Sequence, residues 1–128
     1  MEAIKAALDV TDGEAILRIS WALAGHDLER KFGYGYKVKT MSLYSLLNYI
    51  GEDIDLIKMD IERAEFRILR NCDERIFNHV KQWIVECHSY NSEEEAELEA
   101  IFEAHDYCVT WLEPNGFKGR HIYALRNS

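Results

Sequence analysis

The stretch "DLIKMDIERAEFRIL" (residues 55–69) indicates an α/β fold, because it changes from the pattern of a strand to that of a helix. Its first part, residues 55–60, is short and mostly apolar, which predicts a buried strand. The apolar stripe of an amphipathic helix follows at spacings of three and four residues: Ile61, Ala64, Ile68 and Cys72. Asp60, Glu62 and Glu65 fall where the strand becomes the helix, so this junction is a candidate site.

The sequence before this stretch predicts strands, a loop and one helix. Residues 3–21 contain two strand-like runs around an Asp-Gly turn. Residues 21–37 hold three glycines and predict a long loop, and residues 36–41 alternate as a short strand does. A helix is predicted at residues 43–50, with a serine as N-cap before it and a glycine just after it.

The sequence after residue 69 also predicts helices and strands in turn. Residues 75–82 continue helically, and residues 83–88 form another buried strand. A helix follows at residues 92–105, begun by a capping box of Ser92 and Glu95. Residues 107–126 read as two strands joined by a Pro-Asn-Gly loop, an antiparallel hairpin. This order predicts one α/β domain with a mostly parallel sheet and an antiparallel C-terminal strand.

Composition limits the class of protein. The chain has 128 residues, a formal charge of −8 and 48% apolar residues, as expected of one soluble domain. A pI near 5.1 argues against a nucleic acid or an anionic membrane as the main partner. Three cysteines without CxxC spacing predict reduced, mostly buried thiols in a cytoplasmic protein, and no zinc site.

Polar side chains end two consecutive predicted strands. Asp60 and Glu62 follow the first strand, while Glu86 and His88 lie two residues apart on one face of the second. Ligands of open α/β sheets bind outside the carboxyl ends of the strands. If these strands are neighbours, the four side chains meet in one crevice. There they can orient a substrate hydroxyl, accept its proton or hold a divalent cation.

Structural roles remain open for the same residues. Asp60 and Glu62 can serve the positive N-terminus of the following helix, worth ~0.3–1 kcal/mol. Glu86 can pair with Lys58 or Lys81, and His88 can be an ordinary loop residue. The remaining histidines show no ligand spacing and predict structural or surface roles: His26, His79, His105 and His121. The glutamates of residues 93–99 predict a solvated helix face.

The central stretch resembles the signature of the FkbM-type methyltransferases, which reads approximately I-D-L-[IL]-K-[IM]-D-[IV]-E-G-A-E. Further similarity lies in "AALDVTDGEAILRIS", "VKTMSLYSLL", "WIVECHSY" and "HDYCVTWL", so that the resemblance spans about residues 6–126. It implies a class I, Rossmann-like fold that transfers a methyl group from S-adenosylmethionine to a hydroxyl of a sugar, lipid or other small molecule. It also implies catalytic roles for Asp60, Glu62, Glu86 and His88, and a cofactor-binding role for Glu65.

Two departures from the family pattern stand out. The glycine-rich turn that normally holds the donor has no counterpart in residues 1–39, so we expect a partial domain that lacks its donor-binding half. The signature glycine is Arg63, although glycine there permits close approach or a positive φ. We expect Arg63 to place its guanidinium in the crevice and to pair with Glu62 or Glu86.

A partial domain of this kind would leave one edge of its sheet unpaired. In the full fold the strand at residues 55–60 pairs with a first strand that this chain lacks, and exposed apolar edges invite pairing with another chain. We therefore expect a homodimer or a partner chain at this edge. Two other functions compete with methyl transfer: a non-catalytic interaction module, and, least favoured, a metal-dependent hydrolase that uses the four polar strand-end residues.

Overall fold

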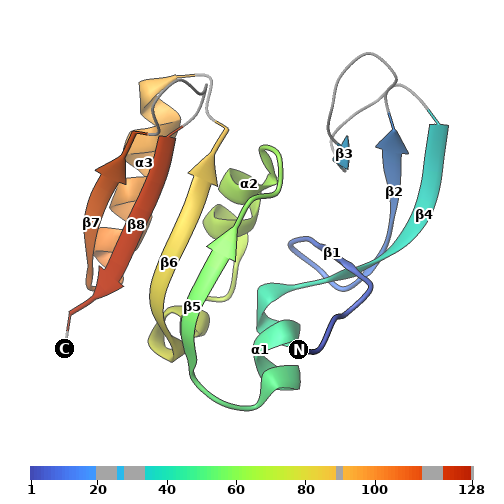
Figure 1. Cartoon of the computed structure of the whole chain (residues 1–128), viewed down its shortest axis with the longest axis horizontal. Helices are drawn as coiled ribbons and strands as arrows, with labels where there is room; N and C mark the ends of the chain where they lie inside the picture. Colours follow the sequence, from blue (N-terminus) through green and yellow to red (C-terminus); the bar gives the residue numbers. More distant parts are fainter. Residues whose placement is uncertain (20–25, 28–33, 89–90, 114–119, 128) are drawn as a thin grey trace.

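The computed structural model describes residues 1–19, 26–27, 34–88, 91–113 and 120–127, which form two four-stranded sheets and three α-helices (Figure 1). The N-terminal sheet consists of β1 (Ala7–Leu8), β2 (Gly13–Ile19), β3 (His26–Asp27) and β4 (Tyr34–Met41). The C-terminal sheet consists of β5 (Ile54–Met59), β6 (Val80–Cys87), β7 (Tyr107–Leu112) and β8 (Arg120–Arg126). The helices are α1 (Leu43–Ile50), α2 (Ala64–Asn71) and α3 (Ser92–Ala104), with a 3₁₀ helix at Glu74–His79.

The N-terminal sheet has the strand order β1-β4-β2-β3. β2 and β4 pair antiparallel from Gly13 opposite Thr40 to Ile19 opposite Tyr34, while the short β1 runs parallel to β4. The strand predicted at residues 36–41 is confirmed within β4. The prediction of a loop is wrong for residues 34 and 35, whose backbone pairs with that of β2. It is also wrong for β3, and the rest of that loop lies outside the described residues.

The C-terminal sheet has the strand order β5-β6-β8-β7. β5 and β6 are parallel, and the C-terminal hairpin of β7 and β8 is antiparallel as predicted. As expected, this sheet is mostly parallel: β5, β6 and β7 run in one direction, and the C-terminal strand β8, inserted between β6 and β7, is antiparallel to both. The N-terminal sheet departs from the expectation, because β4, β2 and β3 pair antiparallel. The chain thus has a mixed α/β fold with partly parallel sheets.

α2 and α3 pack side by side on one face of the C-terminal sheet (Figure 1). β6 sends Trp83, Val85 and Cys87 to this face at every second position, and all three are buried. The rings of Phe77 and Phe102 lie 5.8 and 5.7 Å from that of Trp83. These aromatic contacts form the centre of the core, which fixes the end of β6 relative to α2.

The helix boundaries follow from local capping. Ser42 caps α1 by accepting a hydrogen bond from the Ser45 amide, and Gly51 ends it in the left-handed region at φ 76°. The capping box predicted at Ser92 is wrong by one residue: Asn91 is the N-cap, and its side chain accepts from the amide of Glu94. The helix predicted through residue 82 gives way to the 3₁₀ turn, because Val80 already belongs to β6.

The face of the C-terminal sheet that the helices do not cover carries exposed leucines, and the outer edge of β5 pairs with no described strand. Leu56, Leu112 and Leu125 are each more than two-fifths exposed. β5 stands last in the strand order and pairs, among the described strands, with β6 alone. No helix in the described ranges is both long enough and apolar enough to span a membrane.

Candidate functional site

The imidazole of His88 lies at the centre of four carboxylates. Its Nε2 is 3.8 Å from Asp60 Oδ1, 3.6 Å from Glu62 Oε2 and 3.7 Å from Glu86 Oε1. Its Nδ1 is 3.2 Å from Glu65 Oε1. The structure therefore brings together all five residues that the sequence singled out.

The parallel pairing of β5 and β6 explains this convergence. Met59 stands opposite Val85, so the chain leaves both strands at the same edge of the sheet. Asp60 follows β5 directly, and Glu86 lies near the carboxyl end of β6. Because Glu86 alternates with the buried Val85 and Cys87, its side chain lies on the face away from the helices. This is the strand-end position where α/β folds bind ligands.

The turn between β5 and α2 has a strained backbone. Glu62 and Arg63 have φ values of 46° and 77°, in the left-handed region that glycine adopts without strain. Arg63 stands at the position of the signature glycine, and its positive φ is the reason why a glycine suits this position. Its guanidinium donates to the carbonyl of His88 at 2.9 Å and lies 3.6 Å from Glu94, whereas we had expected a pair with Glu62 or Glu86.

Glu65 lies beneath the site and is fully buried. Its Oε1 accepts a hydrogen bond from the His88 amide at 2.7 Å and contacts the His88 ring. Its Oε2 is buried and has no hydrogen-bond partner in the described part of the chain. With Nδ1 donating to Glu65, the Nε2 of His88 faces the other three carboxylates. The cofactor-binding role that the resemblance gives to Glu65 stays a prediction.

Glu86 has histidines as neighbours. Besides His88, it lies 3.6 Å from Nε2 of His121, which stands directly opposite it on β8. Lys81, one of the two lysines considered as its partner, instead bonds to Asp55 at 2.6 Å. His121 was predicted to be structural or on the surface, and only the register of β6 and β8 reveals that it borders the site.

Three of these residues have the geometry of a metal-binding group. Asp60, Glu86 and His88 each offer one ligand atom, and these atoms lie within 4.8 Å of one another. Asp60 and Glu62 are 41% and 45% exposed, whereas His88 is 18% exposed. The cluster is thus open on the side of Asp60 and Glu62 and closed below by Glu65, so a ligand can approach from solvent.

The comparison with protein families identifies the chain. Residues 7–118 match the family model described as the methyltransferase FkbM domain. The chain belongs to the FkbM methyltransferase family. The matched range includes the whole carboxylate cluster, so the resemblance seen in its sequence is confirmed for this FkbM chain. No curated protein and no solved structure gives a significant match.

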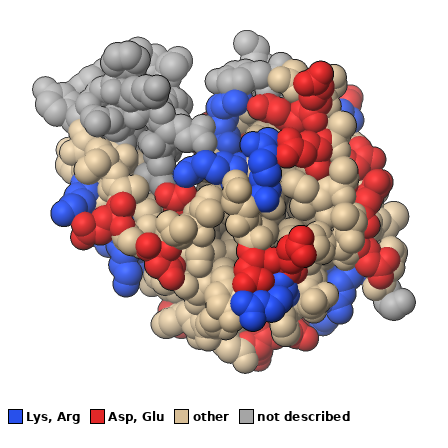
Figure 2. Space-filling model, turned by 180° about the vertical axis from the view of Figure 1, so that it is seen from behind, with Lys and Arg blue, Asp and Glu red and all other residues tan. Residues whose placement is uncertain are grey.

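The glutamates of α3 in this FkbM chain are not simply a solvated face, which corrects the prediction. Glu97 accepts two hydrogen bonds from Arg70 of α2, at 2.5 and 2.7 Å, and Glu95 accepts one from Arg120 at 2.8 Å. Glu99 accepts from the indole of Trp111. Figure 2 shows acidic and basic side chains next to one another on the face that the helices cover. These pairs fasten α3 to its neighbours.

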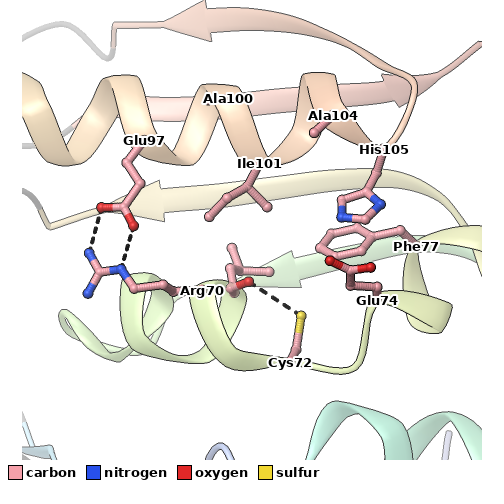
Figure 3. Close-up of a pocket in the computed structure, with 10 residues that line it drawn as sticks. Arg70, Cys72, Glu74, Phe77, Glu97, Ala100, Ile101, Ala104 and His105 are labelled. Atoms are coloured by element: carbon pink, nitrogen blue, oxygen red, sulfur yellow. Dashed lines mark hydrogen bonds and ion pairs between the residues drawn. The ribbon is translucent and has the colours of Figure 1, made fainter.

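A hollow of about 340 Å³ lies between α2 and α3, with Arg70 and Glu97 at one end and the stacked rings of Phe77 and His105 at the other (Figure 3). The ring centroids of that stack are 4.1 Å apart, which gives His105 a structural role. None of the five candidate site residues lines this hollow. It is therefore separate from the carboxylate cluster.

Proposed function

We propose that the carboxylate cluster serves the acceptor side of methyl transfer to a hydroxyl of a small molecule or sugar. The convergence of Asp60, Glu62 and Glu86 on His88 is the observation that supports this proposal. A hydroxyl oxygen that forms a bond to a methyl carbon must give up its proton, so it needs an adjacent proton acceptor, and a carboxylate within hydrogen-bond reach of that hydroxyl can fill this role.

The residues have separate tasks in this proposal. Asp60 and Glu86 orient the acceptor hydroxyl from the ends of β5 and β6. Glu62, which the strained turn holds at the open side of the cluster, takes the proton. His88 is fixed from below by Glu65 and lies between the three acidic side chains. Removing a positioned general base typically lowers the rate by ~10²–10⁴-fold.

The methyl donor of the family is S-adenosylmethionine, which supplies an electrophilic methyl group. The described residues fit the acceptor better than this donor. Residues 1–39 contain no glycine-rich turn of the kind that cradles a nucleotide, and the carboxylate of Glu65 is fully buried against His88. We therefore assign no residue of this chain to a step on the donor.

Isothermal titration with S-adenosylmethionine tests the enzymatic function. Micromolar binding supports a methyltransferase, whereas no binding at millimolar donor leaves a non-catalytic member of the family. If the donor binds, Glu62→Gln tests the catalytic role directly, because it removes the proposed proton acceptor at a partly exposed position. We expect it to bind the donor like the wild type and to lose methyl transfer to an accepted substrate. Equal transfer rates in the two proteins would contradict the role of Glu62.

A further inference from the structure

We propose that Asp60, Glu86 and His88 form a binding site for one divalent transition-metal ion, with Glu65 as the carboxylate that orients the histidine ligand. The inference adds a ligand to the site of the proposed function. Binding of the ion itself requires neither a methyl donor nor catalysis.

The spacing of the side chains is the first argument. The Nε2 of His88 lies 3.6–3.8 Å from oxygens of Asp60, Glu62 and Glu86, which is beyond hydrogen-bond range. Ligand atoms bound to one ion at ~2.0–2.2 Å lie ~3–3.6 Å from one another. The three proposed ligand atoms lie within 4.8 Å of one another, so side-chain rotations would have to draw them together around an ion.

The charges around His88 are the second argument. Four carboxylates lie around the imidazole of His88, with His121 beside Glu86, and negative charges this close to one another repel. The guanidinium of Arg63 donates to the His88 carbonyl and lies 3.6 Å from Glu94. A divalent ion between Asp60 and Glu86 would offset this repulsion where the carboxylates meet.

Glu65 is the third and independent argument. It is fully buried, points at His88 and leaves Oε2 without a described hydrogen-bond partner. Metal-bound histidines usually donate their second ring nitrogen to a carboxylate, which fixes the tautomer and aims the other nitrogen at the metal. Because Glu65 takes Nδ1, the Nε2 of His88 is the nitrogen that faces Asp60 and Glu86.

The ligand set indicates the class of ion. One imidazole nitrogen and two carboxylate oxygens favour a first-row transition ion such as Mn²⁺ over Ca²⁺, which prefers oxygen ligands throughout. The open side of the cluster leaves coordination positions for water or a substrate oxygen. Glu62 lies outside the metal-binding group and stays available as the proton acceptor.

Titration with Mn²⁺ alone tests the proposal, on the whole chain purified without a polyhistidine tag. We expect one ion to bind per chain with micromolar affinity, and its spin-echo spectrum to show coupling to a histidine nitrogen. Glu86→Gln should weaken binding at least tenfold, and His88→Gln should remove the nitrogen coupling. Glu65→Gln should weaken binding ~10–100-fold although it touches no ion. Asp55→Asn, which changes an exposed acid in β5, is the matched control and should bind like the wild type.

The outcomes separate this inference from the proposed function. No Mn²⁺ binding at millimolar concentration would overturn the metal site, and so would equal affinity in the wild type, Glu86→Gln and Asp60→Asn. Circular dichroism of each variant shows that loss of binding is not loss of fold. Mn²⁺ binding without donor binding supports the metal site and contradicts the enzyme. Donor binding without Mn²⁺ binding does the reverse.

Discussion

A single oxygen of Glu65 holds both the backbone and the ring of His88: Oε1 lies 2.7 Å from the amide nitrogen and 3.2 Å from Nδ1. The contact joins the first turn of α2 to the residue that follows β6. Because Glu65 is fully buried, the fold and the site depend on the same carboxylate.

Replacing Glu65 should therefore destabilise the protein. Glu65→Ala leaves the partly buried amide of His88 without its acceptor, so we expect a loss of ~1–3 kcal/mol in the free energy of unfolding. Glu65→Gln keeps a side-chain carbonyl and should lose less. Urea denaturation measures both, with Glu62→Ala as the control, since a partly exposed side chain should change stability by only ~0.5 kcal/mol. Equal stability of Glu65→Ala and the wild type would contradict this role.

Arg63 adopts a backbone conformation that glycine accepts more easily. At φ 77° a residue with a Cβ is strained by ~1–2 kcal/mol. Glycine avoids this strain, but its more flexible unfolded state offsets part of the gain in stability. Arg63→Gly and Arg63→Ala both remove the guanidinium contacts, but only the glycine relieves the strain. We expect Arg63→Gly to be more stable than Arg63→Ala by ~1 kcal/mol in urea. An alanine variant at least as stable as the glycine variant would show that the backbone is not strained.

The three thiols should differ in reactivity. The sequence predicts mostly buried cysteines, but Cys108 is exposed, Cys72 half-buried and Cys87 buried, and all three are free. Burial raises the pKa of Cys72 to about 11 and that of Cys87 to about 12. At pH 8 a disulfide reagent should therefore modify Cys108 quickly and the other two only on unfolding. Cys108→Ser should abolish the fast phase, and a second fast thiol would be unexpected.

The same pKa values predict how stability depends on high pH. Both thiols hold their protons more tightly in the folded state than at the reference pKa of 9.0. Their contribution to the free energy of unfolding is thus fully present below pH 9 and falls as the pH rises through about 11 and 12. Urea midpoints of Cys87→Ala should decline less between pH 9 and 11 than those of the wild type. Parallel declines would exclude Cys87 as a cause.

We propose that a second copy or a partner chain covers the free edge of β5. Leu56 in this strand is 47% exposed, and β6 is its one described neighbour in the sheet. Light scattering should show a dimer for the isolated chain, and Leu56→Asp should dissociate it. Leu112→Asp is the matched control, because Leu112 is equally exposed but lies on β7 at the far edge. A monomer whose β5 amides exchange freely with solvent would contradict the proposal.

Several features could be predicted from local patterns alone. The periodicity of residues 43–50 and their capping residues predicted α1, and the change of period at Asp60 predicted the junction of β5 and α2. The alternation of residues 36–41 predicted most of β4, whereas residues 34 and 35 extend that strand only through their pairing with β2. The antiparallel insertion of β8 between β6 and β7 is likewise a long-range pairing with no local signal.

Sequence patterns alone place Asp60, Glu62, Glu86 and His88 at the ends of two apolar strands and Glu65 in the first turn of the helix after β5, which makes these five residues the candidate site. Their arrangement in space depends on the tertiary structure. The parallel register of β5 and β6 sets their separations, and burial beneath His88 turns Glu65 into its support. The pairing of β6 with β8 adds His121 beside Glu86. Such distances depend on packing between segments far apart in the chain, which no local pattern of residues encodes.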